Sequence, residues 1–137
     1  MSTTETKTAR KKFNLLYVDD EKSNLNVFKI AFKKQFNIIT AANGVEALEV
    51  LDSGQSDIHV LVTDQRMPKM TGLELLERVT EKYPEIIKLV ISEYSNDKVI
   101  REAMEKFNIL CRIHKPWDWD YVKSQIDGAL KEKYGEF

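Results

Sequence analysis

The sequence has few of the features that mark disulfide-rich, membrane-spanning or nucleic-acid-binding proteins. Its single cysteine, Cys111, excludes an internal disulfide and is typical of a protein in a reducing cytosol. No apolar run approaches the ~20 residues of a membrane span, and the polar first residues lack the apolar segment of a signal peptide. The 21 Lys and Arg residues against 22 Asp and Glu residues leave a net charge of -1, without a case for binding nucleic acid. We therefore expect a cytoplasmic protein that contacts neither nucleic acid nor membrane directly.

Length and composition predict one domain. The chain has 137 residues, of which 42% are hydrophobic and 31% charged, as in ordinary globular proteins with a substantial core. Residues 1–12 are polar and rich in Thr and Lys, and we expect them to form a disordered leader. Residues 13–137 are expected to form the single domain, because no internal repeat or interdomain linker interrupts them.

Short apolar runs alternate with helical patterns along the rest of the chain. The runs predict strands at 15–18, 37–41, 58–63, 86–91 and 109–113. We expect helices over 24–35, after Asn43-Gly44, from Gly72 to Pro84, after Asn96-Asp97, and after Asp118. The fourth helix is expected to bury an apolar face made of Val99, Ile100, Ala103, Met104 and Phe107.

This alternation predicts an α/β fold. Five strands alternating with five helices give βαβ units, and hence a parallel sheet with helices on both faces. Right-handed crossovers bring the C-terminal ends of all the strands to one edge of that sheet. Open parallel sheets bind their ligands beyond this edge, so polar residues at the strand ends are the candidates for a functional site.

Acidic, basic and hydroxyl side chains follow four of the five apolar runs. They are Asp19-Asp20 after 15–18, Asp64 after 58–63, Ser92 after 86–91 and Lys115 after 109–114. Three carboxylates that meet at one edge would repel one another unless a divalent cation joined them. The pattern therefore predicts a metal site beside a nucleophilic carboxylate.

Each of these residues has a place in phosphoryl-transfer chemistry. Oxygen ligands suit Mg²⁺, or Mn²⁺, which Asp20 and Asp64 could bind directly and Asp19 through water. A carboxylate can attack phosphorus and hold the phosphoryl group as an acyl phosphate. Such a transfer needs charge neutralisation, which the compact ammonium of Lys115 could supply while the Ser92 hydroxyl donates to a phosphoryl oxygen.

In this order and placement, the residues resemble the receiver domain of response regulators in two-component signalling, including the chemotaxis receivers. The matching segments are Val18-Asp19-Asp20-Glu21, Asp64-x-x-Met67-Pro68-x-Met70-x-Gly72, Ser92 and Lys115-Pro116. The resemblance covers residues 15 to 130, nearly all of the expected domain. It implies a flavodoxin-like, doubly wound sheet of five parallel strands in the order 2-1-3-4-5 with five helices.

The resemblance also implies a function. It makes Asp64 the phosphoacceptor. It implies that Mg²⁺ is bound by Asp19, Asp20, Asp64 and the backbone carbonyl of Arg66. It also implies that Ser92 and Lys115 contact the phosphoryl group. The phosphodonor would be a phosphohistidine on a sensor histidine kinase or a phosphotransfer protein. The output would pass through the fourth helix, fifth strand and fifth helix to a downstream protein or output domain, and the same face can form a homodimer. Such a domain promotes its own phosphorylation and dephosphorylation but is not a turnover enzyme.

Two positions depart from the usual receiver pattern. Receivers usually carry a small residue after the Ser or Thr, where this chain has Glu93, and Tyr or Phe three positions before the Lys, where it has Arg112. One hypothesis is that Glu93 and Arg112 form a charge pair in place of the aromatic switch, and the alternative is that both point separately into solvent. The departures also leave open an interaction domain that keeps the fold but works without phosphorylation.

Two other classes fit less well. A haloacid-dehalogenase-like phosphatase also uses Mg²⁺ and an aspartyl phosphate, but places its nucleophile in an Asp-x-Asp motif after the first strand. Here the candidate nucleophile, Asp64, follows the third predicted strand, and Asp19-Asp20 lacks that spacing. A flavodoxin-like cofactor carrier is disfavoured because no Gly-rich phosphate loop follows a strand.

Overall fold

The structure, a computed structural model, describes residues 12–93, 98–114 and 117–135. Its strands are β1 (Phe13–Val18), β2 (Phe36–Ala41), β3 (Val60–Asp64), β4 (Ile87–Ile91) and β5 (Cys111–Ile113). Its helices are α2 (Lys22–Phe32), α3 (Gly44–Ser53), α4 (Gly72–Lys82), α5 (Lys98–Lys106) and α6 (Trp119–Tyr134). Apart from Lys12, the predicted leader lies outside the described residues.

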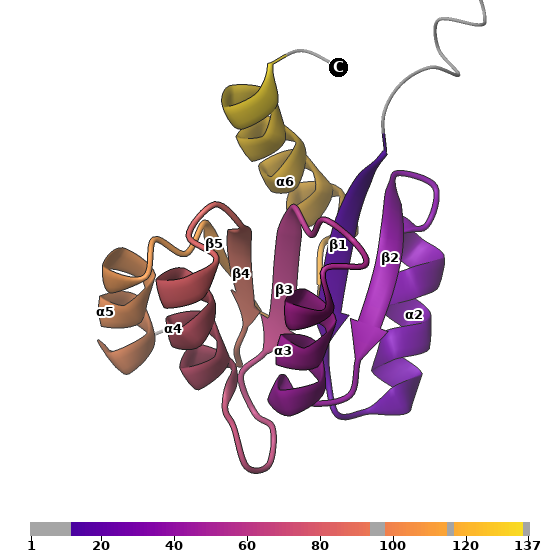
Figure 1. Ribbon diagram of the computed structural model, residues 1–137. Coiled ribbons are helices and arrows are strands. Elements are labelled where there is room, and N and C mark those ends of the chain that lie inside the picture. Colours follow the sequence, from indigo (N-terminus) through magenta and orange to yellow (C-terminus); the bar gives the residue numbers. More distant parts are fainter. Residues whose placement is uncertain (1–11, 94–97, 115–116, 136–137) are drawn as a thin grey trace, which may run out of the picture.

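The five strands form one parallel sheet in the order β2-β1-β3-β4-β5, as Figure 1 shows. Chain order and sheet order differ because the chain moves outward from β1 to β2 and then crosses back to β3. This is the predicted doubly wound, flavodoxin-like arrangement, and it is confirmed. The switch in direction lies between β1 and β3, where open sheets of this kind bind their ligands.

Each face of the sheet carries its own apolar core, because successive strand residues point to opposite sides. On one face, Leu16, Val18, Leu61 and Val90 pack with buried residues of α3, α4 and α5. On the other face lie the aromatic residues of β1 and α2 together with α6: Phe13, Tyr17, Phe28, Phe32, Val122, Ile126 and Leu130. Within the described parts of the chain, no helix is both long and apolar enough to cross a membrane.

Side-chain caps fix where three helices begin. Asn43 precedes α3 and accepts a hydrogen bond from the Glu46 backbone N–H at 2.8 Å. Thr71 and Glu74 form a capping box at the start of α4. Asp118 accepts from the Tyr121 backbone N–H at 3.1 Å, so its predicted role as the cap of the last helix is confirmed. These caps satisfy backbone donors that a helix leaves unpaired in its first turn.

The element boundaries and one buried face differ from expectation. The first helix begins at Lys22 and ends at Phe32, short of the predicted end at residue 35. In α5, Ile100 and Ala103 are buried as predicted, but Val99 is 62% exposed and the prediction for it is wrong. At about 100° per residue, Val99 turns away from the stripe that its neighbour Ile100 occupies. The predicted cap Asn96-Asp97 lies outside the described residues.

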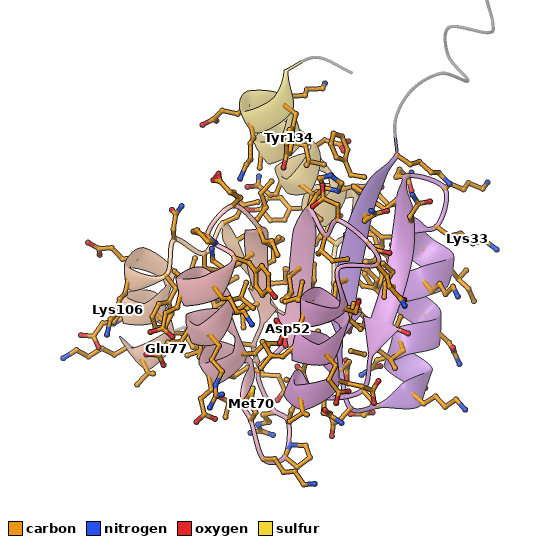
Figure 2. The ribbon with its side chains drawn as sticks, viewed as in Figure 1. Lys33, Asp52, Met70, Glu77, Lys106 and Tyr134 are labelled. Carbon is orange, nitrogen blue, oxygen red and sulfur yellow. The ribbon has the colours of Figure 1, made fainter. Side chains whose placement is uncertain are left out.

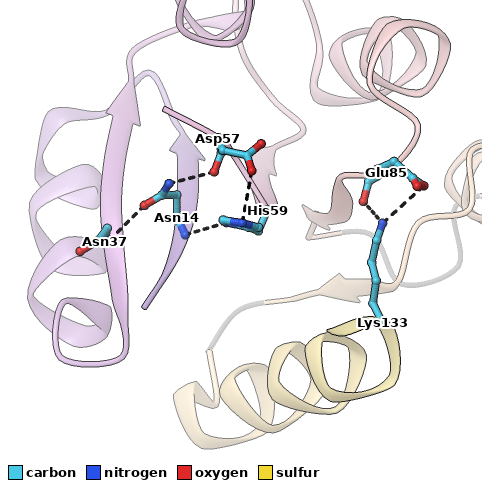
Figure 3. Close-up of polar contacts among 6 residues, drawn as sticks. All are labelled: Asn14, Asn37, Asp57, His59, Glu85 and Lys133. Carbon is cyan, nitrogen blue, oxygen red and sulfur yellow. Dashed lines mark hydrogen bonds and ion pairs between the residues drawn. The ribbon is translucent and has the colours of Figure 1, made fainter. Parts of the chain in front are cut away.

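A polar network ties the strands together at the N-terminal edge of the sheet. Figure 3 shows the Asn14 side chain between β2 and the chain before β3, accepting from Asn37 Nδ2 at 3.0 Å and donating to the Asp57 carbonyl at 2.8 Å. The Asn14 backbone N–H donates to Nδ1 of His59 at 3.0 Å. His59 is buried beneath Phe13 and Tyr134, so it is a structural residue on the edge opposite the predicted site.

Candidate functional site

Strand register brings three of the predicted site residues, Asp19, Asp64 and Ser92, together at the C-terminal edge of the sheet. Val18 of β1 lies beside Thr63 of β3, so Asp19 and Asp64 each come next after a paired residue. Asp64 in turn lies beside Ile91 of β4, and Ser92 follows Ile91. Side chains from three neighbouring strands therefore meet at the switch point between β1 and β3.

Asp19, Asp20 and Asp64 form an acidic cluster. One carboxylate oxygen from each residue lies within 4.8 Å of the other two, close enough for a single cation to contact all three. Asp19 is only 1% exposed, Asp64 is half-buried, and Asp20 is exposed. The cluster thus has one carboxylate inside the protein and one that solvent and solutes reach freely.

Tyr17 and the backbone hold the buried carboxylate of Asp19 in place. The Tyr17 hydroxyl donates to Asp19 Oδ2 at 2.8 Å, and the Glu21 backbone N–H donates to Oδ1 at 3.0 Å. The Asp19 backbone N–H donates to the Ala41 carbonyl at 3.1 Å. Burial raises the pKa of the Tyr17 phenol, and the charge of Asp19 and the hydrogen bond to it raise that pKa further. The phenol therefore keeps its proton and remains a donor.

The backbone around Asp64 is held by the loop that follows it. The Gln65 N–H donates to the Ile91 carbonyl at 2.9 Å, and the Gly72 N–H donates to the Gln65 carbonyl at 3.1 Å. The Gln65 side chain accepts from the Leu73 N–H at 2.8 Å. These bonds fold the start of α4 back onto the end of β3. Met70, labelled in Figure 2, lies on this loop and packs against Gly44. A Cβ added at Gly44 would lie only 2.5 Å from the Met70 sulfur.

Ser92 and the two atypical positions lie on the β4–β5 side of the site. Ser92 is 4% exposed, and its backbone N–H donates to the Ile113 carbonyl at 2.8 Å. Glu93 is exposed, and the described residues contain no ion pair between it and Arg112. Nη1 of Arg112 is buried and has no hydrogen-bond partner. Arg112 therefore does not point freely into solvent as the alternative hypothesis expected. Lys115 and Pro116 lie outside the described residues.

The acidic cluster has the chemistry of a divalent-cation site. All three donors are carboxylate oxygens, the hard ligands that Mg²⁺ prefers. A buried carboxylate such as Asp19 is stable in its charged form only with hydrogen-bond donors or a cation beside it, and two donors to it are in place. The exposed Asp20 leaves the site open to solvent, which suits a cation that keeps several waters.

The model of the response regulator receiver domain matches residues 15–127. The chain belongs to this family. Receiver domains are the signalling switches of two-component systems, they bind Mg²⁺ through acidic residues, and they act together with sensor kinases and output domains. The resemblance that the sequence suggested is thus confirmed over nearly the whole described chain, and this membership disfavours the dehalogenase-like alternative.

This chain is similar both to a protein of about its own length and to longer regulatory proteins. A chemotaxis protein CheY homolog of Campylobacter jejuni is 32% identical over 127 residues, which cover 89% of this chain and 95% of that protein. The hydrogenase transcriptional regulatory protein HoxA of Cupriavidus necator is 31% identical over 121 residues, 88% of this chain. This chain spans only about a quarter of the HoxA proteins that it matches. The signal receiver domain of an HD domain-containing protein from Pseudomonas fluorescens Pf-5 has the same fold, with a TM-score of 0.83 at 21% identity, covering 92% of this chain and all of that one.

Among the site residues, Tyr17 is the one that sequence reasoning missed. It belongs to the apolar run before Asp19 and is fully buried in the core. Its position two residues before Asp19 in a strand was the available signal, because residues i and i+2 of a strand point to the same face. A tyrosine on the face of a buried carboxylate is positioned to donate a hydrogen bond to it.

Proposed function

We propose that this receiver is a phosphorylation-controlled switch that accepts a phosphoryl group on Asp64 in a Mg²⁺-dependent reaction. The convergence of Asp19, Asp20 and Asp64 within 4.8 Å at the switch point of the sheet carries the proposal. We assign the cation to these three carboxylates and the backbone carbonyl of Arg66. When bound, the cation would neutralise charge on the carboxylates and on the incoming phosphoryl oxygens.

The side chains around Asp64 have complementary roles in this proposal. Asp64 is half-buried at the end of β3, so its carboxylate is open to a donor while its backbone is held by the neighbouring loop. A carboxylate oxygen attacks phosphorus as the bond to the donor's imidazole nitrogen breaks. Ser92 comes from the adjacent strand and donates its hydroxyl to a phosphoryl oxygen. Lys115 adds the positive charge that balances the remaining oxygen. The chain then serves as phosphoacceptor in its own phosphorylation and dephosphorylation, without turnover of a further substrate.

Partners follow from this chemistry. The donor is a phosphohistidine on a sensor histidine kinase or a phosphotransfer protein. The output surface that we assign is formed by α5, β5 and α6, the elements that follow Ser92 along the chain. A downstream protein, an output domain or a second copy of the chain would bind there. We place the protein in the cytoplasm, where such kinases present their phosphohistidine.

A second candidate function is a receiver-fold interaction domain that works without phosphorylation. The environment of Arg112 favours it, because a buried guanidinium nitrogen without a hydrogen-bond partner occupies the position of the usual aromatic switch. An exposed carboxylate at Glu93 also adds negative charge beside the phosphoryl site. Such a domain would bind its partner equally well with Asp64 substituted, whereas a switch would not.

Tryptophan fluorescence can test the proposed function. The rings of Trp117 and Trp119 pack against each other near the start of α6, with their centroids 4.5 Å apart. In the sequence they follow Lys115 by two and four residues. Mg²⁺ and then beryllofluoride, a phosphoryl mimic, are titrated into the protein while the emission of the two tryptophans is followed. We expect two saturable changes, with Asp64→Ala removing the second and Asp20→Ala weakening the first. A flat response, or one that neither substitution alters, would contradict the proposal.

A further inference from the structure

The hydroxyl of Tyr17 donates a hydrogen bond to the acidic cluster from within the core of the protein. Tyr17 is 0% exposed and donates to Asp19 Oδ2 at 2.8 Å. A phenol this deeply buried needs an acceptor, and Asp19 supplies it. The bond also uses the carboxylate oxygen that the Glu21 backbone N–H leaves open, so both oxygens of Asp19 have a fixed donor.

Aromatic packing fixes the position of that hydroxyl oxygen. The Tyr17 ring stacks on Phe28 of α2 with centroids 3.9 Å apart and planes 2° apart. Phe28 stacks in turn on Phe32 at 4.3 Å, and Trp119 of α6 closes the edge of Phe28 at 5.9 Å. Because the buried ring lies flat against α2, the hydroxyl oxygen cannot move away from Asp19 without moving that helix. The oxygen of the donor is therefore held beside Asp19 by packing.

We propose that Tyr17 is a positioning residue for the cation site, whose hydroxyl holds Asp19 in the orientation from which it can share a divalent cation with Asp20 and Asp64. The inference rests on the proposed function and adds a residue to it. Groups that orient metal ligands in this way typically change metal affinity by about 10–100-fold when removed. Asp19 is the buried member of the cluster, and among the described residues the Glu21 N–H is the one other group that donates a hydrogen bond to its carboxylate.

Positioning predicts a change in selectivity as well as in affinity. Mg²⁺ demands near-octahedral geometry, whereas Ca²⁺ accepts irregular sets of oxygens. Loss of a fixed Asp19 orientation should therefore weaken Mg²⁺ binding far more than Ca²⁺ binding. A role in core stability alone would not change the ratio between the two cations in the folded protein.

Calorimetric titration of Mg²⁺ and Ca²⁺ into the whole chain and its Tyr17→Phe variant tests the proposal. Tyr17→Phe keeps the ring and its stacking on Phe28 and removes only the hydroxyl. The matched control is Tyr83→Phe, which removes a tyrosine hydroxyl bound to Asp52 at the C-terminal ends of α3 and α4, far from the site at their N-terminal ends. We expect the Mg²⁺ dissociation constant to rise about tenfold in Tyr17→Phe, with Ca²⁺ changed less than about twofold and the control unchanged.

A double-mutant cycle shows whether Tyr17 acts through Asp19. In an Asp19→Asn background, Tyr17→Phe should have no further effect on Mg²⁺ affinity. Unchanged Mg²⁺ affinity in Tyr17→Phe, equal losses for both cations, or additive effects in the cycle would each overturn the inference. If the unsubstituted chain binds neither cation in a manner that depends on Asp20 and Asp64, the proposed function itself fails.

A measurement on the unsubstituted chain covers the case in which Tyr17→Phe does not fold. A buried phenol proton bonded to a carboxylate should give a slowly exchanging downfield proton resonance, and Mg²⁺ should move it as Asp19 takes up its ligand role. A resonance that saturating Mg²⁺ leaves in place, or the absence of any such resonance, would overturn the inference.

Discussion

Gly72 offers a sharp test of how the loop after β3 holds the candidate phosphoacceptor. A Cβ at this position would lie 2.4 Å from the carbonyl oxygen of Asp64 and 3.0 Å from Cα of Gln65. Real Cβ atoms essentially never come closer than 3.0 Å to a heavy atom of a residue that is not their chain neighbour, and backbone atoms cannot rotate out of the way. Gly72→Ala must therefore push α4 away from the end of β3 or displace Asp64 itself.

The expected cost follows from this overlap. Overpacking a well-packed site costs about 1–3 kcal/mol. Alanine recovers at most about 1 kcal/mol of that cost, because it is a better helix former than glycine. We expect Gly72→Ala to lower the free energy of unfolding by about 1–2 kcal/mol. Gly128, inside α6, is the matched control, since nothing lies within 4 Å of its Cβ position. Gly128→Ala should raise the free energy of unfolding by up to about 1 kcal/mol.

The free energy of unfolding of both variants is measured by urea denaturation, with tryptophan fluorescence as the probe. An unchanged m-value would show that the substitutions leave the unfolded state unchanged. Mg²⁺ titration of the folded variants then separates stability from the site. Gly72→Ala should also lose Mg²⁺ affinity, because Asp64 moves with its carbonyl, and Gly128→Ala should not. If Gly72→Ala proves as stable as Gly128→Ala and binds Mg²⁺ normally, the close contact between the start of α4 and Asp64 does not exist as described.

Three further substitutions test other contacts that affect the stability of the fold. Lys88 is buried with one hydrogen bond, to the Ile86 carbonyl at 3.3 Å, and desolvation, with a smaller contribution from Lys133, lowers its pKa below the ordinary 10.5. Lys88→Met should raise the urea midpoint at pH 7. The gain should shrink as the pH rises towards 10.5, because in that range the unfolded wild type binds more protons than the folded wild type, so the stability of the wild type rises with pH. Asn14→Ala removes two side-chain hydrogen bonds at the N-terminal edge of the sheet and should cost about 1–3 kcal/mol in urea unfolding while calorimetric Mg²⁺ affinity stays unchanged. Thr71→Ala breaks the capping box of α4 and should cost about 1 kcal/mol, a value that an unchanged urea midpoint would refute.

The fold was predictable from local patterns because a buried parallel sheet leaves a strong signal. Apolar runs identified all five strands, and the polar residues that follow four of these runs indicated which edge of the sheet carries the site. Boundaries were less accurate where a run begins before its strand does. Residues 109 and 110 are apolar, yet β5 begins only at Cys111, and the Leu110 N–H makes the first backbone bond to β4, to the Lys88 carbonyl at 2.8 Å. Ile109 is buried although its N–H donates to the Met104 carbonyl of α5, so burial of an apolar residue does not require that its backbone join the sheet.

Side-chain contacts were the part that the sequence did not reveal. Glu93 and Arg112 stand near each other in the expected site, but whether two long side chains pair depends on rotamers that no local pattern specifies, and the structure contains no such pair among its described residues. The role of Tyr17 was not predicted, for a different reason. Its ring fits the apolar run of β1, so nothing in the run itself pointed to the hydroxyl that reaches Asp19.

Phosphoryl transfer to the intact chain tests the central claim most directly. The protein is incubated with acetyl phosphate and Mg²⁺, the acyl phosphate is reduced with borohydride, and the modified residue is located by mass spectrometry of peptides. We predict one phosphoryl group per chain, located on Asp64, absent in Asp64→Asn and absent when a chelator removes the cation. A phosphoryl group that persists in Asp64→Asn, or a wild-type chain that stays unmodified with Mg²⁺ present, would contradict the assignment of Asp64 as the phosphoacceptor.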